Sequence, residues 1–283
     1  MFGFLNIYKP KGMTSHDVVA ILRRITKVKQ IGHTGTLDPF AEGVLPIAIG
    51  KATRLIEYLN DDKAYIGTIK LGKSTTTYDS EGEVTNSSDK EVSIDEINSI
   101  LNQYKGRITQ YPPIYSAIKI NGKKLYEYAR KGETVEVQPR EVSIYKLDIL
   151  NYNSETKELE IYVECSKGTY IRSLANDIGE TLGAYGYLSA LKRVKAGDFE
   201  IKASVKLEDL QSIDDVVHSL QNPIYYINCP KYVINQLELS IVLNGNPIQT
   251  NISDGRTLIT DGENIIAIGL VENNILKPQK VFT

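Results

Sequence analysis

Residues 1–225 alternate irregularly between strand-like and helix-like hydrophobic periodicity, and this feature restricts the fold more than any other. Residues 4–9, 141–152 and 157–166 have the pattern of strands, whereas residues 18–25 place apolar side chains on one helical face. A doubly wound parallel sheet would instead require a regular succession of strand and helix. The pattern therefore predicts an α+β fold with a mixed sheet and flanking helices.

Local signals predict further elements. Thr14 and Asp17 have the spacing of a capping box before the first helix. We also expect helices over residues 51–59, before Gly132 and over residues 173–183. Residues 79–82 have the composition of a turn.

The pattern changes near Pro223, where the chain passes into a second segment. Residues 231–283 contain short strand-like stretches separated by three Asn-Gly or Asp-Gly pairs. Such pairs favour tight hairpin turns. We therefore predict a domain of residues 1–225, followed by a small β-rich module of residues 226–283.

The composition excludes several classes of protein. Of the 283 residues, 41% are hydrophobic, which is enough to form a core. No run of about eighteen apolar residues is present, so we expect no membrane span, and no cleaved secretory signal is expected either. The two cysteines, Cys165 and Cys229, give neither a disulfide framework nor, with three histidines, a zinc pattern. A reducing, cytoplasmic setting fits best, and Cys165 is expected to be a buried strand residue.

Charge is unevenly distributed along the chain. The formal net charge is -2, but residues 1–60 carry +4 and the remainder carries -6. A basic face on an acidic body can attract phosphate groups, although ordinary solvated lysines give the same count. Tyrosine is abundant, with 18 Tyr against 5 Phe and no Trp, and a tyrosine ring can stack on a base. Neither feature by itself identifies a nucleic-acid partner.

Residues 32–43 form a turn-rich loop between two apolar segments, and this loop carries the first candidate for chemistry. Asp38 precedes Pro39, which is a common turn sequence, so a purely structural role is one interpretation. However, loops held by a rigid scaffold often carry catalytic groups, and a carboxylate can act as a covalent nucleophile without a metal. His33 suits an acid or base, a metal ligand or a nucleic-acid contact. No second residue lies at ligand spacing from His33, which disfavours a metal site.

Three further side chains stand out by their positions. Tyr65 and Tyr170 lie in strand-like or turn segments, where they suit either the core or a stacking surface for bases. Arg172 lies at the start of a predicted helix, where the helix dipole disfavours a cation. This misfit suggests a specific acidic partner, a carboxylate or a phosphate, although a surface arginine is equally compatible. Dinucleotide, P-loop, nucleophile-elbow and zinc-protease motifs are all absent from the sequence.

Six segments, taken together and in order, resemble the stand-alone pseudouridine synthases that modify position 55 of bacterial tRNA. The most specific is GHTGTLDPFAEGVLPIAIGKATR, which resembles the catalytic motif of that family. The others are NIYKPKGMTSHDVV, KAYIGTIKLGKSTTTYDSEG, YPPIYSAIKINGKKLYEYARKG, CSKGTYIRSLANDIGETLG and YLSALKRVKAGDF. The tail, with VLNGNPI and AIGLVENNILKPQKVF, more loosely resembles the PUA-like RNA-binding module of the same family.

The resemblance implies a pseudouridine-synthase catalytic domain with a thumb-like, RNA-gripping insertion at about residues 119–140. It implies that the chain isomerises uridine 55 in the T loop of tRNA, with Asp38 as the catalytic nucleophile and without a metal or cofactor. The substrate-binding residues implied by position are His33, Tyr65, Tyr170, Arg172 and Leu191. His33 would help to displace the uridine and Tyr65 would stack on the flipped base. Arg172 would pair with Asp38.

This isomerisation exchanges a bond from ribose to nitrogen for a bond from ribose to carbon, so no atoms are gained. The target base must leave its stack, at a cost of roughly a few kcal/mol, and a ring such as Tyr65 can offset about 1–3 kcal/mol by stacking. Asp38 can attack carbon 6 of uracil or the anomeric carbon of ribose, and the sequence does not separate the two routes. The base that takes the proton from carbon 5 is also open, with Tyr65 a candidate by position.

The predicted partner is the T stem-loop of tRNA, with no membrane and no obligatory protein partner. We expect a monomer, because RNA would occupy the basic face, and binding that weakens steeply with salt. Three alternatives are open: a non-catalytic RNA-binding or tRNA-folding protein, a related enzyme of the guide-RNA-dependent dyskerin group, and an α+β protein whose Asp38 loop is structural. The thumb-like insertion argues against the second, because the resemblance ties it to stand-alone tRNA recognition.

Overall fold

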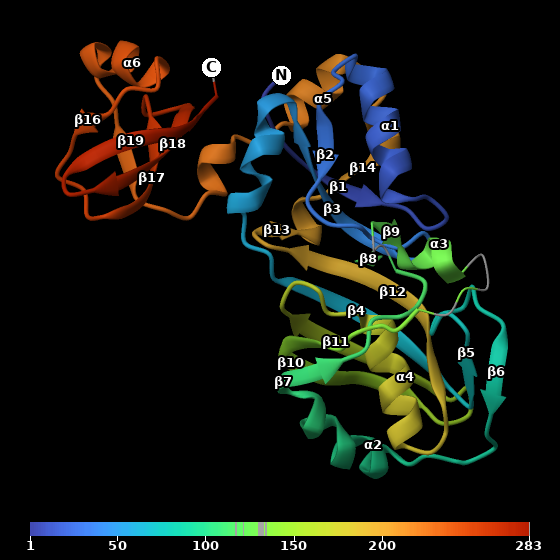
Figure 1. Cartoon of the computed structure of the whole chain (residues 1–283). Coiled ribbons are helices and arrows are strands. Elements are labelled where there is room, and N and C mark those ends of the chain that lie inside the picture. Colours follow the sequence, from blue (N-terminus) through green and yellow to red (C-terminus); the bar gives the residue numbers. More distant parts are fainter. Residues whose placement is uncertain (117, 121, 130–132, 134, 283) are drawn as a thin grey trace.

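The computed structural model describes residues 1–116, 118–120, 122–129, 133 and 135–282. A large mixed sheet runs through most of the molecule, and a five-stranded sheet forms the C-terminal part (Figure 1). The strand order along the main path of the large sheet is β14-β1-β3-β12-β4-β11-β10-β7. The predicted α+β class with a mixed sheet is therefore confirmed.

Within the described residues, ten strands make the large sheet and two short ribbons accompany it. The strands of the sheet are β1 (Gly3–Lys9), β2 (Ile31–His33), β3 (Glu42–Ile49), β4 (Lys63–Leu71), β7 (Gly106–Gln110), β10 (Arg140–Asn153), β11 (Glu158–Cys165), β12 (Gly186–Ala196), β13 (Phe199–Glu200) and β14 (Val205–Lys206). The ribbons are β5 (Lys73–Thr75) with β6 (Val84–Ser87), and β8 (Lys119–Ile120) with β9 (Lys123–Lys124). In the large sheet β1 is parallel to β14 and β3 is parallel to β12, while the other pairs are antiparallel.

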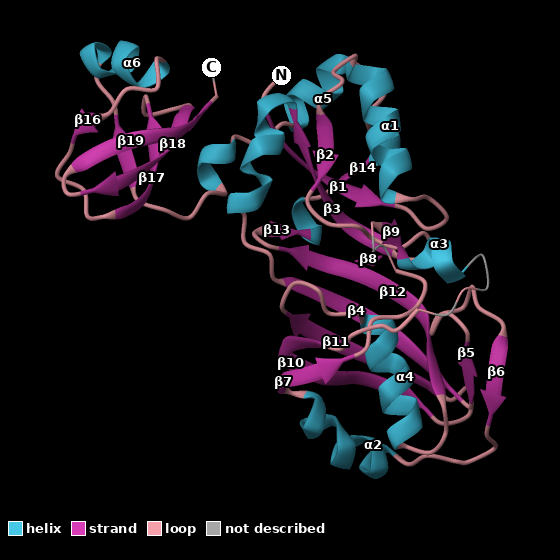
Figure 2. Ribbon diagram, in the orientation of Figure 1, coloured by secondary structure: helices cyan, strands magenta, loops and turns pink. Residues whose placement is uncertain are grey.

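Helices gather at the two ends of the large sheet (Figure 2). α1 (Ser15–Thr26) and α5 (Ile213–Ser219) lie together at one end, and α2 (Ile94–Leu101) and α4 (Ile171–Thr181) lie together at the other. The other helical segments before residue 230 are α3 (Leu125–Ala129) and the 3-10 helices η1 (Gly50–Tyr58), η2 (Asn102–Tyr104), η3 (Ile201–Ala203), η4 (Leu207–Asp209) and η5 (Pro223–Tyr225).

Local sequence explains where α1 begins and which side it buries. Thr14 Oγ1 accepts a hydrogen bond from Asp17 N at 3.1 Å, and Asp17 Oδ2 accepts one from Thr14 N at 2.9 Å. This reciprocal capping box satisfies two backbone donors that the first turn leaves free. Val18 and Leu22, one turn apart, are fully buried. The prediction of a capped amphipathic helix is confirmed.

Two other predicted helices differ in detail from the sequence expectation. Residues 51–59 were expected to be helical, and the structure has η1 there, a 3-10 helix with 3-residue rather than 4-residue hydrogen bonding. The segment from Ser173 onwards was expected to open a helix, and α4 begins two residues earlier, at Ile171. Arg172 therefore lies inside the first turn of α4.

The register of three neighbouring strands brings the loop after β2 toward the centre of the sheet. β12 pairs along its length with β4, so that Leu191 is opposite Gly67 and Arg193 is opposite Tyr65. On its other side β12 runs parallel to β3, with Arg193 opposite Gly43. Side chains from β4 and β12 therefore lie next to the loop of residues 34–41 that precedes β3.

The contact between β3 and β12 depends on the absence of a side chain at Gly43. Gly43 has φ +110, and a Cβ atom there would lie 2.3 Å from the carbonyl oxygen of Arg193. Gly43→Ala is expected to lower the free energy of unfolding by about 2–4 kcal/mol, because backbone strain and strand separation add. Urea unfolding measures this difference. Gly245→Ala is the control, since Gly245 has φ +78 but no heavy atom within 4 Å, and equal losses in the two variants would contradict the steric argument.

The C-terminal module contains a helix that the sequence analysis did not predict. Its sheet consists, in spatial order, of β15 (Lys231–Val233), β17 (Gly255–Thr260), β18 (Ile265–Glu272), β19 (Ile275–Val281) and β16 (Ile248–Gln249). The β-rich character of the tail is thus confirmed, but residues 236–243 form α6 (Gln236–Leu243) rather than a strand. A capping box between Asn235 and Glu238 starts this helix. Its short apolar run shows no helical periodicity in the sequence, so it could not be distinguished from a strand.

Apolar contacts fix this module against η1. Leu258, Ile268 and Phe282 of the module share one buried cluster with Leu55 of η1 and Phe199 of β13. Charged groups surround this cluster: the Arg256 guanidinium lies 4.7 Å from the centre of the Tyr58 ring, and Arg54 donates to the carbonyl oxygen of Val281 at 2.9 Å. The domain boundary near residue 225 stays a prediction.

The predicted thumb-like insertion, at about residues 119–140, falls only partly within the described residues. β8, β9 and α3 lie in its first half. Residues 121, 130–132 and 134 lie outside the described part of the chain, and the predicted helix end at Gly132 is among them. The RNA-gripping role of this segment stays a prediction.

Candidate active site

All six residues singled out from the sequence line one cavity. The cavity has a volume of about 680 Å³ and opens between the loop of residues 34–41, β4, β12 and the start of α4. The six are His33, Asp38, Tyr65, Tyr170, Arg172 and Leu191. They come from segments up to 158 positions apart, so only the sheet topology brings them together.

The N-terminal segment holds the loop that carries Asp38. Ser15 Oγ accepts from Leu37 N at 2.8 Å and donates to Leu37 O at 3.0 Å. The carbonyl oxygen of Pro39 accepts from Gly12 N at 2.8 Å and from Lys9 Nζ at 3.4 Å. Buried carbonyl groups need such partners, and here they fix the backbone on both sides of Asp38. The loop is thus anchored by residues that precede it by about two dozen positions.

Lys9 itself is completely buried, which is uncommon for a lysine. Its ammonium group donates to the carbonyl oxygens of Met13 at 2.6 Å and Pro10 at 2.9 Å, besides Pro39. Burial lowers the pKa of Lys9 to about 8, and the negative charge of Asp38 opposes this shift. Lys9 therefore acts as a clamp that joins the end of β1 to the Asp38 loop.

Arg172 joins two carboxylates at the wall of the cavity. Arg172 Nε lies 3.1 Å from Asp38 Oδ2, and Arg172 Nη1 lies 3.1 Å from Asp79 Oδ2. Arg172 Nη2 also donates to the carbonyl oxygen of Tyr115 at 3.0 Å. Arg172 and Asp79 are 5% and 2% exposed, so this charge is compensated by partners instead of by water. The acidic partner suggested by the position of Arg172 is therefore present twice.

The surroundings of Asp38 act on its pKa in opposite directions. Burial raises the pKa of this carboxyl group, the Arg172 guanidinium lowers it, and the negative charge of Asp79 raises it again. Burial has the larger effect, so the pKa lies above the ordinary aspartate value. About a third of the Asp38 side chain, 34%, faces the open cavity. The carboxylate is thus held by Arg172 on one side and accessible to a ligand on the other.

Aromatic and aliphatic side chains form the remaining walls. Tyr65 of β4 is 7% exposed, and burial raises its pKa to about 12. Tyr170 precedes α4, where Gln110 holds its backbone by accepting from Tyr170 N at 2.7 Å and donating to Tyr170 O at 2.9 Å. Leu191 of β12 is 6% exposed. A flat, partly apolar ring would fit between such walls and meet Asp38 at one edge.

His33, at the end of β2, lies at the cavity with an unused polar atom. Its Nδ1 is buried and has no hydrogen-bond partner. Burial lowers the pKa of His33, and the positive charge of Arg193 lowers it further, so the ring is neutral near pH 7. Among the residues that the structure describes, no group of three His, Cys, Asp or Glu side chains is arranged to hold a metal ion.

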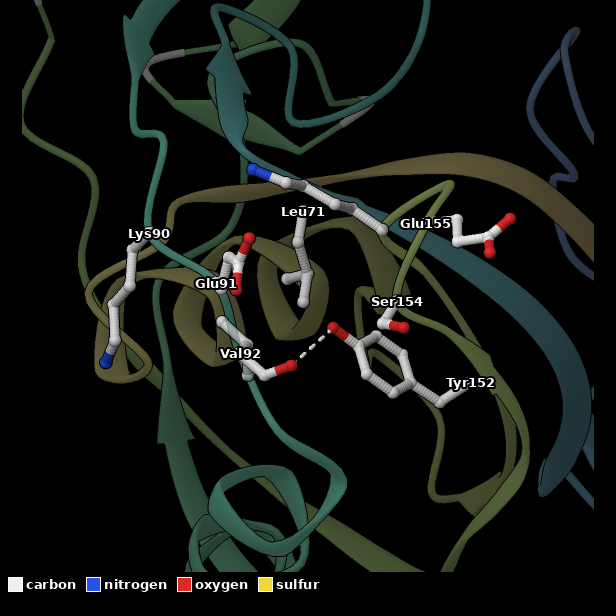
Figure 3. A pocket seen from close by; sticks show the side chains of 8 residues that line it. Leu71, Lys90, Glu91, Val92, Tyr152, Ser154 and Glu155 are labelled. Atoms are coloured by element: carbon white, nitrogen blue, oxygen red, sulfur yellow. Dashed lines mark hydrogen bonds between the residues drawn. The ribbon is translucent and has the colours of Figure 1, made fainter.

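A second cavity lies elsewhere in the molecule and has a different character. Figure 3 shows this cavity, of about 240 Å³, next to Leu71 and Val92. Tyr152 donates a hydrogen bond across it to the carbonyl oxygen of Val92 at 2.8 Å. Lys90 at its edge already pairs with Glu96 at 3.2 Å. None of the six candidate residues lines it.

Three polar residues of the site were not assigned a role from the sequence. Asp79 was expected to lie in a turn and Lys9 at the end of a strand, and Arg193 was not singled out. One signal was available for Arg193, because it occupies an inward position two residues from the buried Leu191. For Asp79 and Lys9 the sequence offers no comparable sign, since a turn aspartate and a strand-end lysine are usually exposed.

No helix in the described part of the chain is both long enough and apolar enough to cross a membrane. Both cysteines are free, with Cys165 buried at the end of β11, as its strand pattern predicted.

The fold is that of a pseudouridylate synthase, an enzyme class whose reaction is an isomerisation. Residues 23–171 match the family model described as the N-terminal domain of TruB family pseudouridylate synthases, and residues 172–222 match the model described as the tRNA pseudouridylate synthase B C-terminal domain. The first match alone covers more than half of the chain. The chain belongs to the TruB family of pseudouridylate synthases.

Curated relatives are similar over the whole length of the chain. Proteins named tRNA pseudouridine synthase B from Staphylococcus haemolyticus and Caldanaerobacter subterraneus are 44% and 41% identical, with 99% of each chain covered in both cases. The protein of the same name from Trichormus variabilis is 40% identical, covering 100% of this chain and 99% of the relative.

Solved structures share the fold at lower identity. A Cbf5-Nop10-Gar1 complex contains a chain that matches with a TM-score of 0.75 and 26% identity, covering 100% of this chain and 85% of that one. The archaeal box H/ACA sRNP Nop10-Cbf5 complex gives a TM-score of 0.72 and 25% identity, covering 99% and 86%. The mixed-sheet architecture is therefore common to this chain and to Cbf5.

Proposed function

We propose that the chain isomerises uridine 55 in the T loop of tRNA to pseudouridine, with Asp38 as the covalent nucleophile. The observation that carries this proposal is the Arg172–Asp38 contact of 3.1 Å at a cavity walled by Tyr65 and Leu191. The arrangement supplies an ionised carboxylate, its counterion and a slot for a planar base. The names of the 40–44% identical relatives support tRNA as the substrate.

The reaction requires the uridine to leave the RNA stack and enter the cavity. Extrusion costs roughly a few kcal/mol, and stacking on the Tyr65 ring returns about 1–3 kcal/mol. Tyr170 and Leu191 bound the uracil on the remaining sides. His33 is neutral and has an Nδ1 atom without a hydrogen-bond partner. We propose that it occupies the position in the RNA that the flipped uridine vacates, or contacts the RNA backbone at that position.

Asp38 then starts the exchange of bonds. The bond from the anomeric carbon of ribose to nitrogen 1 breaks, the uracil turns, and a bond from that carbon to carbon 5 forms. The bond between Asp38 and the substrate is broken again, carbon 5 loses its proton to solvent and nitrogen 1 takes one up, so substrate and product have the same composition and no cofactor is consumed. Arg172 keeps Asp38 ionised until it attacks, by countering the effect of burial. Attack on carbon 6 of uracil and attack on the anomeric carbon both fit this geometry.

A stand-alone enzyme, monomeric and cytoplasmic, is proposed over a guide-RNA-dependent one. The relatives at 40–44% identity match over 99–100% of this chain and carry a tRNA enzyme's name, whereas the Cbf5 chains are 25–26% identical. Two free cysteines are compatible with a reducing compartment. The T stem-loop is therefore the proposed partner, without an obligatory protein subunit.

Release of tritium from carbon 5 tests the proposed reaction directly. The purified full-length protein is incubated with an unmodified tRNA transcript tritiated at carbon 5 of its uridines, without metal or nucleotide. About one equivalent of tritium per tRNA is expected, with the modified base mapped to position 55. Release that maps to another position would keep the chemistry and overturn the substrate. Tight tRNA binding without release would favour the non-catalytic RNA-binding alternative.

The pH dependence of the single-turnover rate reports the ionisation of Asp38. A nucleophilic carboxylate must be deprotonated, so activity is expected to fall as the pH decreases through the pKa of Asp38. Because burial raises that pKa, the midpoint should lie above the ordinary value of about 4. Asp79→Asn removes a charge that raises this pKa and should therefore move the midpoint to lower pH. A midpoint below the ordinary value would contradict this assignment.

Tyr65→Phe tests whether the Tyr65 hydroxyl takes the proton from carbon 5. The pKa of Tyr65 is about 12, so the phenol is protonated when free and must lose its proton within the closed complex. The variant keeps the stacking ring and is expected to bind tRNA normally but to stop at a rearranged or covalent intermediate, visible by denaturing gel electrophoresis. Tyr170→Phe, which removes another hydroxyl from the same cavity, is the matched control. Full turnover by Tyr65→Phe would exclude this role.

A further inference from the structure

Arg193 is the largest fully buried side chain among the residues that the structure describes, and the proposed reaction does not yet use it. It lies on β12 between β3 and β4, with Gly43 and Tyr65 as its Cα partners, and it is 1% exposed. A buried arginine normally has a carboxylate partner. Among the described residues, no carboxylate forms an ion pair with Arg193.

Backbone carbonyl groups take the place of that partner. Arg193 Nε donates to the carbonyl oxygen of Val44 on β3 at 2.7 Å. Arg193 Nη1 donates to Thr36 O at 3.1 Å, and Nη2 donates to Gly35 O at 3.1 Å. The planar guanidinium thus ties the strand after the Asp38 loop to the two carbonyl groups just before Asp38. Arg193 thus joins Lys9, Gly12 and Ser15 as a donor that holds this loop.

The positive charge of Arg193 acts on the groups that face the cavity. Burial raises the pKa of Asp38 and of Tyr65, and Arg193 opposes the shift in both. Burial lowers the pKa of His33 and of Lys63, and Arg193 acts in the same direction on both. The charged and titratable groups around Arg193 are Lys9 on β1, His33 on β2, Asp38 in the loop, and Lys63 and Tyr65 on β4. The only carboxylate among them is Asp38.

We propose that Arg193 is a positioning residue of the isomerase: its guanidinium fixes the loop that presents Asp38, and its unpaired charge favours the ionised nucleophile. This inference rests on the function proposed above. Geometry and charge are separable here, because lysine keeps the charge without the planar fork and methionine keeps only the volume. The two substitutions therefore test the two parts of the role.

The experiment measures steady-state kcat and KM by tritium release, and the single-turnover rate as a function of pH, for Arg193→Met, Arg193→Lys and the wild type. Arg193→Met is expected to reduce kcat by about 100-fold with little change in KM, since a displaced nucleophile affects the chemical step more than binding. In this variant the low-pH decrease of the single-turnover rate, the acid limb of its pH profile, should move to higher pH, because Asp38 loses a nearby cation. Arg193→Lys is expected to reduce kcat by about 10-fold and to leave the acid limb in place. Lys192→Met, which removes an exposed cation on the same strand, is the control and should behave as wild type.

Wild-type kcat in Arg193→Lys, or an unmoved acid limb in Arg193→Met, would overturn the corresponding half of the proposal. If Arg193→Met does not fold, Arg193→Lys retains a buried cation with three donors, and its kcat at unchanged KM decides the positioning role. An inactive wild-type protein would instead contradict the proposed function. If the wild type and both Arg193 variants are fully active, only the inference about Arg193 is contradicted.

Discussion

Asp38→Asn is expected to reduce pseudouridine formation by about 10⁴-fold or more while tRNA binding stays nearly unchanged. The substitution keeps the shape of the side chain and removes the charged oxygen that attacks, and loss of a covalent nucleophile has effects of that order. Tritium release measures the rate, and filter binding measures the affinity for tRNA. Retained activity would return Asp38 to the role of a turn residue.

The stability of Asp38→Asn separates a catalytic from a structural aspartate. The pKa of Asp38 is raised in the folded protein, so the folded state holds a proton more tightly than the unfolded chain. Stability therefore decreases as the pH rises through the interval from the ordinary pKa to the raised one, and ionised Asp38 is a cost at neutral pH. Asparagine removes this cost, and Asp79 still neutralises Arg172. We expect a Tm equal to or above that of the wild type, whereas a turn residue needed for folding would give a lower one.

Arg172→Met is expected to have the second largest effect, because it removes the ion-pair partner that Asp38 and Asp79 share. Removing one partner of a buried ion pair typically costs about 3–5 kcal/mol of stability. Without Arg172, repulsion from Asp79 and burial would both raise the pKa of Asp38, so at neutral pH a smaller fraction is ionised and activity should fall by at least about 100-fold. Urea unfolding and single-turnover rates measure the two losses.

Two comparisons make the Arg172 prediction specific. Lys167→Met removes an exposed cation that pairs with Asp61 at the surface, and it should change the stability by less than about 1 kcal/mol. Adding Asp79→Asn to Arg172→Met removes one of the two carboxylates that lost their ion-pair partner. The double variant should recover part of the lost stability without restoring wild-type activity. If the double variant is no more stable than Arg172→Met, the charge argument fails.

Much of the fold was predictable because it depends on local patterns. The capping box follows from the residue types at Thr14 and Asp17, three positions apart. The paired strands β10 and β11 and the buried position of Cys165 follow from periodicity over a few residues. The helix α6 was missed because its apolar residues have almost no preferred side, so an eight-residue run of this kind cannot be told from a strand. The roles of the six candidate residues came from a family resemblance, and the residues alone left a structural turn or a surface arginine open.

By itself the sequence determined the α+β class, the loop that bears Asp38 and the family, since motif order and local periodicity are properties of neighbouring positions. The tertiary structure decided what surrounds that aspartate. Arg172 meets Asp79 across 93 positions, and Arg193 reaches Thr36 across 157, because parallel pairing of β3 with β12 and antiparallel pairing of β12 with β4 bring these segments together. Burial then turns such contacts into strong interactions. No local pattern encodes the register that creates them.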